Sequence, residues 1–130
     1  MTSIMTDHEK LFAKGMRIAR KLTRAEKAMN DATFEIGISQ GACQRLYPKY
    51  SAAEKMVAQA NSPRERSSRS ADFAKIKAEL AEASAKLHNA MRQKREGIQL
   101  CRELGKTLDK IEKAYGAEER ALKKAERAAR

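Results

Sequence analysis

The 130-residue chain contains no tryptophan, only two prolines and two cysteines, and few aromatic side chains. Scarce proline together with abundant Ala, Glu, Lys and Arg favours long, charged helices over sheets. Cys43 and Cys101 lie far apart at apolar positions of helical patterns, so we expect buried free thiols of a cytoplasmic protein rather than a disulfide. The sequence has no apolar run long enough to cross a bilayer and no signal-peptide pattern at its N-terminus. We therefore expect no membrane association.

The sequence also lacks the patterns of catalytic and metal sites. His8 and His88 are isolated, no cysteine pair has metal-ligand spacing, and there is no glycine-rich phosphate loop. Asp and Glu occur mostly beside Lys and Arg on predicted helix faces, as expected for solvated ion pairs. These observations predict neither an enzyme nor a bound cofactor or metal ion.

The formal net charge is +11, from 28 Lys and Arg against 17 Asp and Glu. Basic residues outnumber acidic ones by ten to six in residues 1–60, by three to one in 61–70 and by 15 to ten in 71–130. No segment therefore has the composition of a disordered polybasic tail. A charge of this size favours an anionic partner such as nucleic acid, an anionic membrane or an acidic protein.

Short helices are predicted in the first half of the chain. They span about 7–22, 24–36 and 40–47, with a fourth from position 51 onward. The first has a broad apolar stripe at helical spacing that includes Phe12 and Met16. Thr23 has the position of an N-cap in a capping box, and Gly37 is suited to a left-handed helix stop. Ser39 is suited to cap the third helix, which Pro48 closes.

The order of short helix, tight turn and short helix resembles a helix-turn-helix motif. The residues that carry the resemblance are Ile36, Gly37, Ile38, Ser39, Cys43 and Leu46. Residues 32–57 are similar to the recognition-helix region of tetracycline-repressor-type regulators. The resemblance implies that Gly37 makes the turn, Ile38 fills the space between two helices, and Cys43 and Leu46 pack beneath the recognition helix. The alternative is an ordinary helix stop and N-cap within a helical bundle.

A recognition helix places its N-terminal residues against base edges in the major groove. The resemblance therefore implies that Gln44 pairs with adenine and Arg45 with guanine or a phosphate, while Tyr47 and Lys49 contact the DNA backbone. The full set of DNA-binding candidates is Ser39, Gln40, Gly41, Gln44, Arg45, Tyr47 and Lys49. As an alternative, Arg45 is a solvated surface charge and Tyr47 a half-buried bundle residue.

Residues 61–70, with the sequence NSPRERSSRS, interrupt the apolar patterns and predict a basic linker.

After this linker, apolar residues recur at alternating steps of three and four, which is the heptad spacing of a coiled coil. They are Phe73, Ile76, Leu80, Ala83, Leu87, Ala90, Cys101, Leu104, Leu108, Ile111 and Tyr115, with Lys94 and Gly97 as the weak positions. Residues 71–115 form either one helix or a hairpin. The apolar stripe of this segment has to pack either against the segment's own second half or against another chain, and we favour another chain.

The sequence thus predicts an all-α protein with a helix-turn-helix-like head at 1–60, a basic linker at 61–70, and a coiled-coil or helical-hairpin oligomerisation region at 71–130. The predicted function is binding of double-stranded DNA by a homo-oligomer, in transcription regulation or DNA packaging. The alternative is a basic helical module that binds an acidic protein as an inhibitor or assembly factor, with no DNA role.

Overall fold

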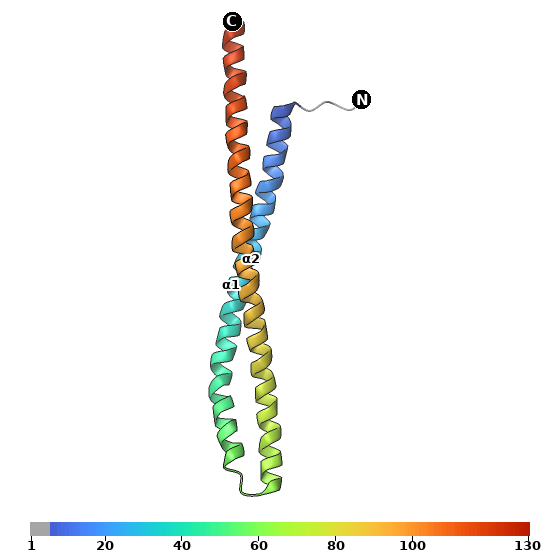
Figure 1. Cartoon of the computed structure of the whole chain (residues 1–130), viewed down its shortest axis with the longest axis vertical. Coiled ribbons are helices and arrows are strands. Elements are labelled where there is room, and N and C mark those ends of the chain that lie inside the picture. Colours follow the sequence, from blue (N-terminus) through green and yellow to red (C-terminus); the bar gives the residue numbers. More distant parts are fainter. Residues whose placement is uncertain (1–5) are drawn as a thin grey trace, which may run out of the picture. The chain divides into compact units, whose positions relative to one another are not determined.

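The computed structural model describes residues 6–130 as two long α-helices joined by a short turn (Figure 1). Helix α1 runs over Asp7–Ala58 and helix α2 over Pro63–Ala129, with 52 and 67 residues. Across the described range no residue lies in a strand. The prediction of an all-α protein is confirmed.

The chain divides into two units, and in each of them a segment of α1 lies antiparallel beside a segment of α2. We call them the terminal unit, described over 6–29 and Glu96–Arg130, and the turn unit, Asn30–Arg95. Each unit contains parts of both helices. The predicted division into a head at 1–60 and a separate region at 71–130 is therefore not the one that the chain adopts.

Buried and half-buried side chains recur along both helices at alternating steps of three and four, and we call these positions the seam. On α1 the seam contains His8, Leu11, Gly15, Ile18, Leu22, Ala25, Met29, Ala32, Ile36, Ser39, Cys43, Leu46, Tyr50, Ala53 and Val57. On α2 it contains all thirteen heptad positions predicted from the sequence, Phe73 to Tyr115, and continues to Glu118.

Small residues bring the two helices into close contact within each unit. In the terminal unit, a Cβ atom added to Gly15 would lie 3.3 Å from Cγ2 of Ile111, and one added to Gly97 would lie 3.2 Å from Cβ of Met29. The buried seam residues of the turn unit are Ala32, Ser39, Ala83 and Ala90. Glycine thus lies at close contacts of the terminal unit, and alanine and serine fill the buried seam positions of the turn unit, where a larger side chain would require the helices to move apart.

The helix ends predicted inside the first half of the chain are wrong, because α1 is continuous from Asp7 to Ala58. Gly37 is an interior helical residue, and no described glycine has a positive φ angle. Instead of capping a new helix, the Thr23 hydroxyl donates a hydrogen bond to the Ala19 carbonyl at 3.0 Å. Pro48 lies inside α1 on its exposed side, where the carbonyl that loses its usual N–H donor can face water.

The reason for this continuity is the packing of α1 against α2. Ile36, Ser39, Cys43 and Leu46 supported the helix-turn-helix interpretation, but their steps of three, four and three also place all four on one side of a straight helix. In the turn unit that side faces α2. Burial along an uninterrupted helix therefore replaces the turn expected at Gly37.

Helix α2 is likewise continuous over 71–115, which settles the alternative between one helix and a hairpin in favour of one helix. Within each unit its seam packs on α1. The sequence favoured another chain as the partner for the apolar residues of this seam. In the structure they pack on α1 of the same chain.

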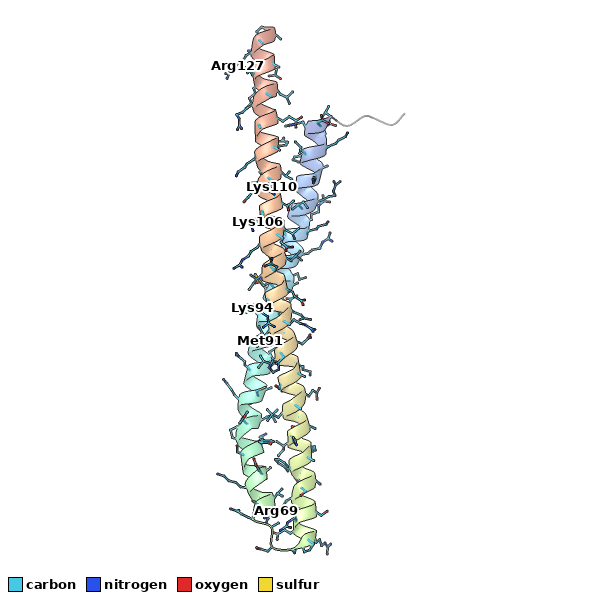
Figure 2. All side chains as sticks on the ribbon, in the orientation of Figure 1. Arg69, Met91, Lys94, Lys106, Lys110 and Arg127 are labelled. Carbon is cyan, nitrogen blue, oxygen red and sulfur yellow. The ribbon has the colours of Figure 1, made fainter. Side chains whose placement is uncertain are left out.

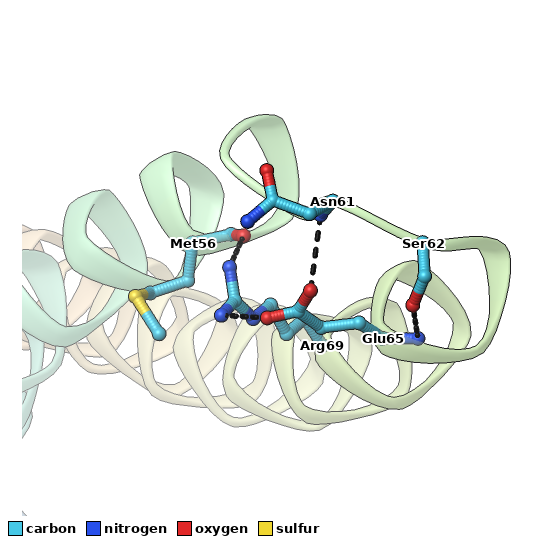
Figure 3. A network of polar contacts seen from close by, with 5 residues as sticks. All are labelled: Met56, Asn61, Ser62, Glu65 and Arg69. Carbon is cyan, nitrogen blue, oxygen red and sulfur yellow. Dashed lines mark hydrogen bonds and ion pairs between the residues drawn. The ribbon is translucent and has the colours of Figure 1, made fainter.

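The turn between the helices is much shorter than the predicted linker, because α2 begins at Pro63. Proline is favoured at the first position of a helix, where no N–H donor is needed. The Ser62 hydroxyl accepts a hydrogen bond from the Glu65 amide at 3.1 Å, and the Glu65 carboxylate accepts one from the Asn61 amide at 3.0 Å (Figure 3). Residues 63–70, predicted as linker, are therefore the capped first turns of α2.

Arg69 connects the two helices at this turn. Its guanidinium donates to the Met56 carbonyl at 2.7 Å and forms an ion pair with Glu65 one helical turn earlier (Figure 3). The Met56 carbonyl lies in the last turn of α1, where carbonyls lack helical donors. Arg69 thus ties the C-terminal end of α1 to the first turns of α2.

A substitution at Gly37 tests the continuity of α1. Nothing lies within 4 Å of a Cβ atom added there. In a helix interior, Gly37→Ala should raise the free energy of unfolding by roughly 0.5–1 kcal/mol, measured by urea denaturation. Gly105→Ala, which is equally open in α2, is the matched control and should give a similar gain. A loss of stability at Gly37 alone would indicate a left-handed turn and refute the continuous helix.

A second prediction concerns the turn. Arg69→Ala should lower the free energy of unfolding by about 1–2 kcal/mol, since it removes a charged hydrogen bond to the Met56 carbonyl and the ion pair to Glu65. Arg66→Ala, an exposed arginine in the same turn, should change it by less than about 0.5 kcal/mol. Equal effects of the two substitutions would show that the Arg69 contacts do not stabilise the turn.

Candidate interaction surfaces

The predicted DNA-binding residues lie in the middle of α1, within the turn unit, and point in different directions around the helix. Ser39 is a seam residue with 4% exposure, which contradicts its expected place facing a DNA groove. Gly41 is half-buried. The remaining candidates, Gln40, Gln44, Arg45, Tyr47 and Lys49, are exposed. The structure therefore does not gather the seven residues on one surface, and their DNA contacts stay a prediction.

The surroundings of two other residues of this part of α1, Ile38 and Tyr47, also differ from those predicted. Ile38 was expected to fill the space between two helices, but it is 49% exposed on α1. Tyr47, expected at the DNA backbone, lies 6.4 Å from Tyr50 between ring centroids, and Tyr50 lies 5.0 Å from Phe73 of α2. Tyr47 therefore continues an aromatic contact between the helices while keeping 63% of its surface exposed.

An apolar groove runs between α1 and α2 in the terminal unit. Its volume is about 300 Å³, and it is lined by Leu11, Phe12, Gly15, Met16, Ala19, Leu108, Ile111, Glu112 and Tyr115. Phe12 and Met16 on its α1 side keep 57% and 42% of their surface exposed. The lining is almost entirely apolar, and its two largest exposed side chains are only partly covered, although the Phe12 ring lies 6.1 Å from the Tyr115 ring between centroids. This combination is typical of a binding surface.

The groove continues along α1 into a more polar hollow, lined by Met16, Ala19, Arg20, Thr23 and Arg24. It belongs to a strongly basic stretch, because residues 10–27 contain seven Lys and Arg and one acidic residue. All seven basic side chains are exposed. An apolar strip and a basic flank therefore lie next to each other on α1.

A second basic surface follows α2 in the same unit. It consists of Arg102, Lys106, Lys110, Lys113, Arg120, Lys124 and Arg127, all exposed and spaced mostly by three or four residues, so that they form one row. Figure 2 labels three of them, Lys106, Lys110 and Arg127. Among the ion pairs of the described residues, none involves a side chain of this row. We call it the basic row.

His8 appears isolated in the sequence but has close neighbours in the terminal unit. Its ring stacks on Tyr115 with centroids 4.1 Å apart, and its Nδ1 atom lies 4.0 Å from the Glu118 carboxylate. His8 precedes Leu11 by three residues and Glu118 follows Tyr115 by three, so both continue the seam spacing. This packing gives His8 a structural role.

Sequence reasoning missed the exposed apolar side chains because it assigned them to helix cores. Phe12 and Met16 were counted in a broad apolar stripe, and Ile38 in a turn core. The signal that separates them was available: the α1 seam follows alternating steps of three and four from Leu11 onward, and none of these three residues lies on it.

Within residues 6–130, no three His, Cys, Asp or Glu side chains lie close enough together to hold a metal ion. In the same range, neither helix has the length of apolar sequence needed to span a membrane. Comparison of the chain with protein-family models, with curated proteins and with solved structures found no match.

Proposed function

We propose that the protein is a non-enzymatic helical interaction module whose terminal unit binds an acidic amphipathic helix of a partner protein. The observation that supports this function best is the apolar groove, in which Phe12 and Met16 remain partly exposed beside Leu108 and Tyr115. A helix laid along two packed helices presents one apolar stripe to such a groove. The partner helix would then cover side chains that the two-helix unit leaves in water.

The charge around the groove favours an acidic partner. Arg20 and Arg24 line the hollow next to Met16 and Ala19, and the stretch 10–27 is strongly basic. Opposite charges at the rim of an interface accelerate association and select the partner. A helix with apolar residues on one face and Asp or Glu on the others has the complementary pattern.

Binding of duplex DNA, the function predicted from the sequence, is the second candidate, and the basic row favours it. Seven exposed Lys and Arg side chains along one helix can contact successive phosphates. Since α1 has no separate recognition helix, such binding would rest on phosphate contacts and be largely independent of DNA sequence.

The two candidates use different residues, so paired variants distinguish them. The groove variant is Phe12→Ser with Met16→Ser, and the row variant is Lys106→Gln with Lys110→Gln and Lys113→Gln. The first probe is a designed helical peptide of about 20 residues with Leu at heptad positions and Glu elsewhere, long enough to cover the groove. The second probe is a duplex DNA, and both are titrated by fluorescence anisotropy.

We expect the peptide to bind the unmodified protein, and the groove variant to weaken this binding by about tenfold or more, as for the loss of central apolar contacts. The row variant should weaken it much less. A peptide with Ser in place of Leu controls for charge alone. If both peptides bind equally, binding rests on charge alone and the groove proposal is wrong. If only duplex DNA binds and only the row variant weakens it, the DNA candidate replaces the proposed function. Circular dichroism checks that both variants keep their helicity.

A further inference from the structure

The outer face of α1 in the turn unit carries an apolar patch that α2 does not cover. Phe34 and Ile38 are one helical turn apart and keep 69% and 49% of their surface exposed. Next to them, nothing lies within 4 Å of a Cβ atom added to Gly37. Residues 36–44 contain no charged side chain, although 35% of the whole chain is charged. This patch is distinct from the groove of the proposed function and lies in the other unit.

Two opposite charges border the patch at equal distances from its centre. Asp31 lies seven residues before Ile38 and Arg45 seven residues after it, and both are exposed. Seven residues are two turns, or about 10.5 Å along the axis, so all three side chains project from the same side of α1. Nη1 of Arg45 lies 3.2 Å from the Cβ position of Gly41. The Arg45 side chain therefore extends along this face.

We propose that this face binds the same face of a second copy of the chain, with the two α1 helices antiparallel and a two-fold axis near Ile38. This arrangement places Asp31 of each copy at the same level as Arg45 of the other, because the two charges are equally far from the axis. It also places Phe34, four residues before Ile38, within one residue of the level of Gly41 of the second copy, which follows Ile38 by three residues. The absent side chain at Gly41 leaves room for the ring to approach the backbone once Arg45 turns to Asp31.

The pattern of charges favours a second, antiparallel copy of the chain as the partner of this face. A parallel second copy would set Asp31 beside Asp31 and Arg45 beside Arg45, and like charges in contact oppose association. A phosphate backbone would meet Asp31 and the apolar patch. The antiparallel pairing of two copies satisfies both charges and covers both Phe34 rings.

The interface is small, since it uses about four turns of one helix from each copy. Stable dimers bury roughly 1,200 Å² or more in total. We therefore expect weak dimerisation, with a dissociation constant on the order of micromolar. Sedimentation equilibrium of the full chain measures this constant.

Exchanging the charges of Asp31 and Arg45 tests the proposed antiparallel pairing. Asp31→Arg alone places two arginines together at both ends of the interface, and Arg45→Asp alone places two aspartates together. Each single variant should dimerise at least about tenfold more weakly than the unmodified protein. Mixing the two single variants should restore dimerisation as a heterodimer, because every contact again joins Arg to Asp. The double variant should dimerise with itself.

Matched controls separate this effect from net charge. Asp109→Arg and Lys55→Asp make the same kinds of change at exposed positions outside the patch, and they should leave the dimerisation constant within about threefold. Phe34→Ser should weaken dimerisation by at least about tenfold without changing helicity. A protein that stays monomeric up to about 1 mM, far above the expected constant, overturns the proposal. So does a dimer that both single charge variants leave intact, or a mixture that fails to form the heterodimer.

Discussion

The close contact between α1 and α2 along a line of small side chains is the constraint on which the rest of the structure depends. Gly15 packs near Ile111 and Gly97 near Met29, at distances that leave no space for a larger residue without movement. Alanine and serine occupy the buried seam positions of the turn unit. The small residues let large seam residues of the other helix, such as Ile111, pack closely on the backbone, while Phe12 and Phe34 lie off the seam on exposed faces.

Two-helix units of this kind can bury only part of their apolar surface. No large side chain among the described residues is fully buried, and Phe12, Met16, Phe34 and Ile38 remain substantially exposed. Burying such exposed apolar clusters against a further helix is favourable, because it removes apolar surface from water. Both proposals follow from this property: the groove of the terminal unit suits a partner helix, and the outer face of the turn unit suits a second copy.

The helical class and the seam of α2 could be predicted from the sequence, because a long heptad repeat admits few other structures. The course of α1 could not be predicted from local signals. Gly37, Ser39 and Pro48 each favour a helix boundary in isolation, and only the burial of Ile36, Ser39, Cys43 and Leu46 against α2 outweighs them. The interaction surfaces depend on which apolar residues α2 leaves uncovered, so they become visible only after the two helices are paired.

The central claim is that α2 packs against α1 of its own chain, and cross-linking tests it most directly. Cysteines replace Met29 and Gly97 in a chain whose Cys43 and Cys101 are changed to alanine. The Cβ position of Gly97 lies 3.2 Å from Cβ of Met29, close to the roughly 3.5–4.5 Å that a disulfide requires. Mild oxidation of dilute protein should give a disulfide within one chain, seen on a non-reducing gel as a band at the monomer mass with altered mobility. A disulfide that forms only between two chains, or no disulfide at all, would contradict this pairing.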